Sequence, residues 1–263
     1  MRKALTIAGS DSGGGAGIQG DLKVFAAHGI YGMSAITALT AQNTLGVQGI
    51  FPIPSSFVKA QIDSVMQDIK ADIWKTGMLL NADIIEVVVE RWRYYEVEHL
   101  VVDPVMISSS GKPLLDKRGI EALERDLLPI TTVLTPNCDE ATVLTGIVIN
   151  TLDDMQKAAL KIHEMGVQNI IIKGGHLPEQ YGIIDLLFDG ETFEEQHSQR
   201  IKTNNSHGTG CAFASSLASQ IAKGASLSSA FKGAHDYVNS ALQQGSSLRL
   251  GHGKGSLQHF PTK

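Results

Sequence analysis

Short apolar runs with strand propensity alternate with longer amphipathic runs along this chain, and no other feature constrains its fold as strongly. The runs expected to form strands are residues 4–8, 34–41, 72–75, 100–103, 132–135 and 169–173. Several of these runs are apolar on both faces, as strands buried in a parallel sheet are. Because strands that alternate with helices form mainly parallel sheets covered by helices on both faces, we predict a three-layer α/β fold.

The amphipathic runs predict helices at residues 17–28, 56–69, 82–94, 118–127, 140–144, 152–164, 210–223 and 228–243. Thr151 and Asp154 stand where a capping box would open the helix at 152–164. A turn around Asp189-Gly190 predicts an antiparallel hairpin of residues 184–188 with 192–197 at one edge of the sheet. No internal repeat or low-complexity linker divides the chain, so we expect one domain over residues 1–263.

The composition argues against several classes of protein. The chain of 263 residues is 43% hydrophobic, and its net charge of −5 with no basic run argues against a nucleic-acid partner. Two cysteines, Cys138 and Cys211, provide no disulfide framework, which is typical of the reducing cytosol. The apolar stretch after the first three residues ends at Gly9, which is too short for a signal peptide. No apolar run approaches the roughly 20 residues that cross a bilayer, so we expect a soluble cytoplasmic protein with no membrane partner.

A glycine-rich turn, Asn204-Asn-Ser-His-Gly-Thr-Gly-Cys211, stands directly before a run of small, helix-compatible residues. The first N–H groups of a helix have no partner within it, and the helix dipole adds about half a positive charge there. Glycine at positions 208 and 210 would let a phosphoryl group approach this backbone closely. The turn is therefore either a phosphate site or a flexible connection into a packed helix, and this stretch alone does not decide between them.

A second glycine-rich loop occupies residues 9–17. Residues 15–20 match the dinucleotide pattern G-x-G-x-x-G, but the match begins several residues after the predicted strand ends. No Asp or Glu occurs between Leu22 and Ile62 to bind a ribose, so we do not expect a nicotinamide site. The loop could instead lie flat under a small planar ligand. Asp21 would then face the pocket, unless it is a solvated acid in the first turn of a helix.

Polar residues follow three of the predicted strands. Asn137 and Glu140 stand at a helix start, either as a capping pair or as groups near a Mg²⁺–phosphate cluster. Asp103 could belong to the same cluster. Lys173, followed by two glycines, suits nucleotide phosphates but also fits a surface lysine beside a turn. Because ligands bind at the carboxyl ends of parallel strands, we expect these side chains to share one site.

Cys211, Met78 and Val105 can each be explained by a structural role. Cys211 stands at a helix N-terminus, where the pKa of a thiol falls, although a small buried residue would look the same. By periodicity alone, Met78 and Val105 would belong to the core. The chain has no zinc-ligand spacing, no serine nucleophile elbow and no P-loop motif.

The order of the motifs resembles the ribokinase superfamily. Within it, the match is close to the hydroxymethylpyrimidine/phosphomethylpyrimidine kinases of thiamine biosynthesis, and it runs nearly from end to end. The residues that carry the resemblance are Ala8-Gly-Ser-Asp-Ser-Gly-Gly-Gly-Ala-Gly-Ile-Gln19, Thr40-Ala-Gln-Asn-Thr44, Lys75-Thr-Gly-Met78, Val102-Asp-Pro-Val-Met106, Thr135-Pro-Asn-x-x-Glu140, Lys173-Gly-Gly-His176 and His207-Gly-Thr-Gly-Cys211.

This resemblance implies a ribokinase-like fold and ATP-dependent phosphorylation of 4-amino-5-hydroxymethyl-2-methylpyrimidine. A second phosphorylation of the monophosphate would then give the pyrophosphate. It also implies Mg²⁺, a cytoplasmic location and a homodimer. For the substrate site, it implies that Gln42 grips the pyrimidine edge, since an amide both donates and accepts. The other residues that it places in the substrate pocket are Gly9, Asp21, Met78 and Val105.

The resemblance further implies that Asn137 and Glu140 belong to a metal and phosphate motif. We expect Glu140 and Asp103 to bind the metal and Lys173 to bind ATP. The anion hole that the resemblance implies consists of Gly208, Thr209, Gly210 and Cys211. Sugar kinases of the superfamily usually carry Asp where this chain has Cys211. The thiol either accepts the proton of the substrate or orients its alcohol, and of these two roles we expect direct participation in the proton transfer.

Other interpretations stay open. A pyridoxal kinase would act on a similar small heteroaromatic ring with a hydroxymethyl arm, and one enzyme could have both activities. A vitamin-precursor binding protein on the same scaffold would not need the anion turn, Lys173 or the Asn137–Glu140 pair. The tail at residues 251–256 has Ser256 where the family resemblance would place proline, and the sequence assigns it no role.

Overall fold

The computed structural model describes residues 1–107, 114–177 and 182–261, and in them the predicted parallel sheet is confirmed. The described part contains an eight-stranded sheet in the order β10-β9-β8-β7-β6-β5-β1-β2. Every neighbouring pair from β8 to β2 is parallel, and β9 and β10 pair antiparallel at one edge. The strands are β1 (Lys3–Ala8), β2 (Tyr31–Ile36), β5 (Ile73–Thr76), β6 (Leu100–Val102), β7 (Val133–Leu134), β8 (Asn169–Ile172), β9 (Ile183–Phe188) and β10 (Phe193–Ser198).

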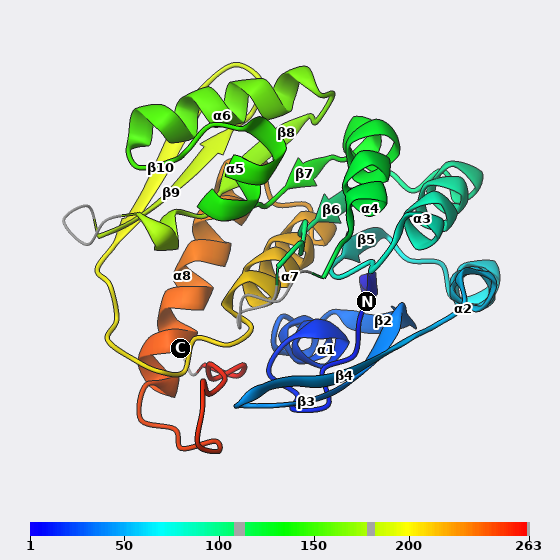
Figure 1. The fold of residues 1–263 in the computed structure, drawn as a ribbon, viewed down its shortest axis with the longest axis horizontal. Coiled ribbons are helices and arrows are strands. Elements are labelled where there is room, and N and C mark those ends of the chain that lie inside the picture. Colours follow the sequence, from blue (N-terminus) through cyan, green and yellow to red (C-terminus); the bar gives the residue numbers. More distant parts are fainter. Residues whose placement is uncertain (108–113, 178–181, 262–263) are drawn as a thin grey trace.

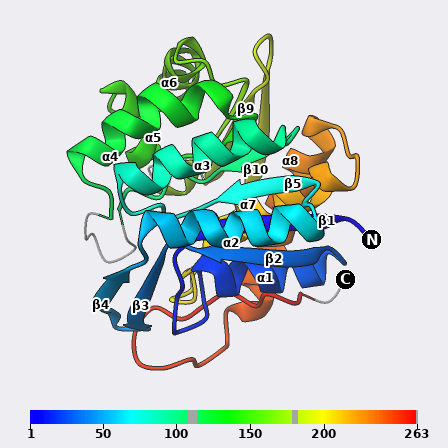
Figure 2. The same cartoon turned by 90° about the vertical axis from the view of Figure 1, so that its right-hand side faces the viewer.

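Two apolar clusters on opposite faces of the sheet make the three layers (Figures 1 and 2). One face is covered by α2 (Ser55–Asp68), α3 (Ala82–Tyr95), α4 (Lys117–Ala122), α5 (Cys138–Thr145) and α6 (Leu152–Glu164). The other is covered by α1 (Gly17–Ala27), α7 (Thr209–Ala222) and α8 (Leu227–Gly245). Leu100 and Val102 belong to the first cluster and Val101 to the second, which is why this strand is apolar on both faces.

A separate two-stranded sheet, β3 (Ala38–Asn43) with β4 (Gly46–Pro52), lies apart from the main sheet (Figure 1). The prediction of one strand over residues 34–41 is therefore wrong. Residues up to Ile36 form β2 and pair with β1. After Thr37, whose hydroxyl donates to the carbonyl oxygen of Met78 at 2.6 Å, the chain continues as β3 and pairs with β4 instead. A change of pairing partner leaves no break in a run of strand-forming residues.

Most other predicted elements agree with the structure to within a few residues. The capping box of Thr151 and Asp154 opens α6, and the predicted antiparallel edge is formed by β9 and β10. The helix expected at 118–127 ends at Ala122 and continues as a π-helical turn over Leu123–Leu127. Across the described ranges, no helix is long and apolar enough to span a membrane. Because one sheet contains strands from residue 3 to residue 198, we propose a single domain.

Candidate active site

A cleft of about 890 Å³ opens where the parallel strands end. The loops after β1, β5, β6, β7 and β8 line it, together with the first turn of α7. It brings together the predicted site residues Gly9, Gln42, Met78, Asp103, Val105, Asn137, Glu140, Lys173, Gly208, Thr209, Gly210 and Cys211. The strand-end position of the site thus follows from the parallel sheet, as expected for this architecture.

Asp21 is the exception, and both interpretations of this residue from the sequence are wrong. Its side chain is 0% exposed and is not among the residues that line the cleft. It accepts hydrogen bonds from Thr6 Oγ1 at 2.6 Å, Ser215 Oγ at 2.7 Å and Lys75 Nζ at 2.9 Å. Burial lowers the pKa of Lys75, but Asp21, Cys211 and Asp103 together outweigh burial and raise that pKa above its ordinary value. Asp21 and Lys75 therefore form a buried ion pair in the interior.

The glycine-rich turn before α7 has the form of an anion site. Gly208, the N-cap of α7, has a φ of +85°, and no side chain caps this helix in the described residues. We expected the N–H of Thr209 to bind an anion. It donates instead to the carbonyl oxygen of Ser206 at 3.3 Å. The N–H groups of Gly210 and Cys211 have no such bond to any described residue, and they remain to bind an anion.

Lys173 lies beside this turn and is not a surface lysine. Its Nζ is 2.9 Å from Asp103 Oδ1, and its side chain is 14% exposed. The same Nζ lies 3.1 Å from the position that a Cβ on Gly210 would take. Burial lowers the pKa of Lys173, but Asp103 and Glu140 outweigh burial and raise it. The ammonium group therefore stays charged at the mouth of α7.

Asn137 and Glu140 form the capping box that opens α5. Asn137 Oδ1 accepts from the N–H of Glu140, and Glu140 Oε2 accepts from the N–H of Asn137, both at 2.9 Å. The structural interpretation is thus confirmed, and both residues also line the cleft. Burial raises the pKa of Glu140 to about 7, with Lys173 opposing this shift and Asp103 adding to it.

Cys211 does not have the lowered pKa expected at a helix N-terminus. Burial raises the pKa of its thiol to about 12, although the nearby ammonium group of Lys75 opposes that shift. The helix dipole stabilises a thiolate, but here desolvation is the larger effect. The thiol is therefore protonated at neutral pH in the absence of ligands.

The substrate end of the cleft contains Gly9, Gln42, Met78 and Val105. Met78 and Val105 are both partly exposed, so their assignment to the core from periodicity is wrong. The terminal methyl carbon of Met78 lies 2.3 Å from where a Cβ on Gly9 would be, so a side chain at residue 9 would require Met78 to move. The hydroxyl of Thr40 donates to the carbonyl oxygen of Ser10 at 2.8 Å and lies 3.3 Å from Gln42 Oε1, so Gln42 is held close to the first glycine-rich loop.

Sequence reasoning missed the pair of Asp11 and His207. His207 Nε2 is 2.7 Å from Asp11 Oδ2 and 3.3 Å from Gln42 Nε2. The carboxylate of Asp11 also accepts from the N–H groups of Gly13 at 2.8 Å and Ala16 at 2.9 Å. An aspartate two residues before a run of glycines was a usable signal, because its carboxylate is a nearby acceptor for their N–H groups. The pair joins the first glycine-rich loop to the anion turn.

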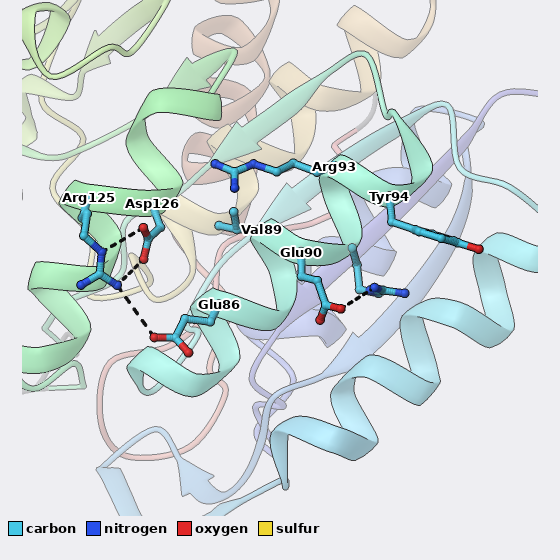
Figure 3. A pocket seen from close by; sticks show the side chains of 8 residues that line it. Glu86, Val89, Glu90, Arg93, Tyr94, Arg125 and Asp126 are labelled. Carbon is cyan, nitrogen blue, oxygen red and sulfur yellow. Dashed lines mark hydrogen bonds and ion pairs between the residues drawn. The ribbon is translucent and has the colours of Figure 1, made fainter.

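A second, shallower depression lies on the outer surface of α3 and the π-helical turn (Figure 3). Its charged side chains pair with one another: Arg125 Nη2 lies 3.8 Å from Glu86 Oε1, and Arg91 Nη2 lies 2.6 Å from Glu90 Oε1. It shares no lining residue with the cleft at the strand ends. We assign it no role in the chemistry.

Comparisons with known proteins find kinases among the relatives of this chain. The phosphomethylpyrimidine kinase family matches residues 11–258. A hydroxymethylpyrimidine/phosphomethylpyrimidine kinase of Bacillus subtilis is 49% identical over 261 residues, which cover 99% of this chain and 96% of that protein. The crystal structure of a phosphomethylpyrimidine kinase from Clostridium difficile has a TM-score of 0.82 at 40% identity, and covers 92% of this chain and 100% of that one. The pyridoxal kinase of Staphylococcus aureus in complex with AMP-PCP has a TM-score of 0.91 at 36% identity, with coverages of 99% and 94%.

Proposed function

The chain belongs to the phosphomethylpyrimidine kinase family, and from this premise we propose how its strand-end cleft acts in thiamine biosynthesis. The reaction is ATP-dependent phosphorylation of 4-amino-5-hydroxymethyl-2-methylpyrimidine, followed by phosphorylation of the monophosphate to the pyrophosphate. One observation carries this proposal. A single cleft contains the ammonium group of Lys173, two helix N–H groups without a backbone acceptor in the first turn of α7, and the neutral amide of Gln42.

The phosphate end of the cleft would hold the transferred group. Lys173 and the N–H groups of Gly210 and Cys211 stabilise the charge that develops on it, which is usually the largest catalytic contribution. Phosphoryl transfer depends mainly on positioning and asks little of a base. Because burial raises the pKa of Cys211 to about 12, we propose that its thiol orients the alcohol and does not remove its proton.

Asp103 and Glu140 fit the Mg²⁺ that this family resemblance implies. Both are buried carboxylates that line the cleft, and burial together with Asp103 raises the pKa of Glu140, an effect that a bound cation would oppose. Mg²⁺ prefers oxygen ligands and keeps several waters, so two carboxylates are a sufficient protein contribution. When bound, the ion would neutralise charge on the phosphates of ATP. Asn137 holds Glu140 in place through the capping box.

The other end of the cleft would bind the pyrimidine. The pyrimidine ring would lie over Gly9, with Met78 and Val105 beside the ring and the amide of Gln42 at the polar edge of the ring. One side of an aminopyrimidine presents an amine donor next to a ring nitrogen acceptor, and a carboxamide pairs with both. Asp21 has no direct part in this site, because it lies in the interior with Lys75.

Separate incubations of the protein with ATP and three acceptors test the proposed reaction. We expect ADP and a product with one added phosphate from the pyrimidine alcohol, and the pyrophosphate from its monophosphate, both detected by mass spectrometry. Pyridoxal is the third acceptor, because a pyridoxal kinase has a TM-score of 0.91 with this chain. If the protein phosphorylates pyridoxal and neither pyrimidine, its substrate is pyridoxal and the proposed pyrimidine reaction is wrong. Failure to consume ATP with any acceptor would point to a binding protein.

We also propose a homodimer formed through the two-stranded sheet. Leu39 of β3 and Phe51 of β4 are directly opposite in the register, and their exposures are 43% and 65%. Two such side chains on one face favour burial against a partner. Sedimentation equilibrium should give twice the chain mass of 28.2 kDa, and a Leu39→Asp/Phe51→Asp double variant should give the monomer mass. A wild-type monomer at micromolar concentration would contradict the proposal.

A cytoplasmic location is a further proposal. It rests on the low cysteine content, because two cysteines in 263 residues provide no disulfide framework, which suits a reducing compartment. We propose no nucleic-acid partner, because the net charge is −5. Fractionation of cells that express the tagged protein tests the location.

A further inference from the structure

The C-terminal tail, residues 251–259, pairs with the loop that connects β3 to β4. The N–H of Gly253 donates to Thr44 Oγ1 at 3.2 Å, and the N–H of Lys254 donates to the carbonyl oxygen of Thr44 at 2.9 Å. A Cβ on Gly253 would lie 2.0 Å from that carbonyl oxygen, so the two backbones are in direct contact. Thr44 is two residues after Gln42, and the tail therefore lies beside the substrate end of the cleft.

The other edge of the tail pairs with the segment before the anion turn. The N–H of Gly255 donates to the carbonyl oxygen of Asn204 at 3.1 Å, and the N–H of His207 donates to that of Gly255 at 3.0 Å. After this contact Leu257 is buried in the apolar cluster beneath α7 and α8. The tail is therefore anchored on both sides, and Lys254 stands between the two sets of backbone contacts.

Lys254 is one of the residues that line the same cleft as Gln42 and His207. The other lysine and arginine residues among its described lining are placed differently. Lys173 lies at the mouth of α7, next to Asp103. Arg200 and Lys202 follow β10, at the opposite edge of the sheet from β1 and β2. The backbone contacts to Thr44 therefore make Lys254 the cation held at the Gln42 end of the described cleft.

We propose that Lys254 binds the phosphate of the monophosphate acceptor and so favours the second phosphorylation. The inference rests on the proposed function and deepens it. The two acceptors share a ring, but the alcohol is neutral whereas the monophosphate carries a charge between about −1.5 and −2. In the second transfer an oxygen of this phosphate forms a bond to the γ-phosphorus while the bond from that phosphorus to ADP breaks. An ammonium group binds phosphate oxygens through charge-assisted hydrogen bonds, and it has no comparable partner on the alcohol.

The test compares the KM values of the two acceptors in Lys254→Met. The ratio of the KM for the monophosphate to that for the alcohol should rise about tenfold, equivalent to about 1.4 kcal/mol. Lys254→Arg keeps the charge and should bring the ratio back to within about threefold of the wild-type value. The matched control is Lys223→Met, which removes the same charge from an exposed position at the far end of α7 and should leave the ratio unchanged.

Two further variants separate phosphate binding from other effects. Gln42→Ala should raise both KM values, because both acceptors present the same ring, and so leave their ratio unchanged. Gly253→Ala displaces the tail from Thr44 while keeping the lysine, and it should raise the ratio as Lys254→Met does. A ratio that stays at the wild-type value in Lys254→Met overturns the inference. If the wild-type protein phosphorylates neither acceptor, the proposed function fails first, and calorimetric Kd values for the two pyrimidines still measure the same ratio.

Discussion

Replacing Gly208 by alanine is expected to lower kcat by at least about a hundredfold, the range seen when preorganised donors to developing charge are lost. Gly208 has a φ of +85°, and a Cβ there would lie 1.9 Å from the carbonyl oxygen of Gly15. The turn must move to relieve this contact, and the N–H groups of Gly210 and Cys211 move with it. Steady-state kinetics with ATP and the pyrimidine alcohol, together with thermal unfolding, measure the two effects.

The chain offers a matched control for the backbone strain. Gly224, after the end of α7, also has a φ of +85°, but no atom lies within 4 Å of the position of its Cβ. Gly224→Ala should therefore lose only the stability that the backbone strain costs, about 1–2 kcal/mol, without affecting kcat. If both variants lose the same stability and keep the wild-type kcat, the turn at 204–211 does not bind the transferred phosphate.

Lys173→Met is expected to lower kcat by about a hundredfold, again the scale of one lost stabiliser of transition-state charge. The change should also alter the dependence of kcat/KM on pH. The pKa of Glu140 is already about 7 because of burial, and Lys173 holds it down while Asp103 pushes it up. In wild-type protein, kcat/KM should therefore rise with pH through the neutral range as Glu140 ionises to the form that binds Mg²⁺. Without Lys173, the pKa of Glu140 rises further and this limb should move to higher pH.

Three variants identify the group whose ionisation makes kcat/KM rise with pH. Lys173→Arg keeps the positive charge, so the limb should stay near its wild-type pH even if the altered geometry lowers the rate. Glu140→Gln should remove the limb. Cys211→Ser should keep it, because the thiol has a pKa of about 12 and does not titrate in this range. A limb that survives in Glu140→Gln and disappears in Cys211→Ser would assign the titration, and a role as base, to the thiol.

The parts of the fold that depend on local pattern could be predicted from the sequence. The run Leu100-Val101-Val102 faces two cores, and this requirement is visible in three consecutive apolar residues. The prediction of one strand over residues 34–41 is wrong, because the chain changes its pairing partner at Thr37, where the hydroxyl donates to the carbonyl oxygen of Met78, 41 positions away. The strand propensity of a short run of residues does not depend on a contact so far away in the sequence, and so it cannot predict that contact.

The candidate site shows the same limit. Its cluster of strand-end residues follows from the rule that ligands bind at the carboxyl ends of parallel strands. Asp21 was misplaced because its partners Lys75 and Ser215 are 54 and 194 positions away, and only the folded chain brings them to it. The pKa of Cys211 was expected to fall because a helix end is visible in the sequence, whereas the burial that reverses the shift is not.

The contact between Gly208 and Gly15 has a consequence for how such a protein can diverge. The backbones of the two loops touch, so neither can be remodelled without disturbing the other. Selection for a new acceptor would therefore be confined to side chains at the rim, such as Gln42 and Val105, while the paired loops are inherited unchanged. Kinases for different vitamin precursors would then differ by a few rim substitutions on a common phosphate-binding frame.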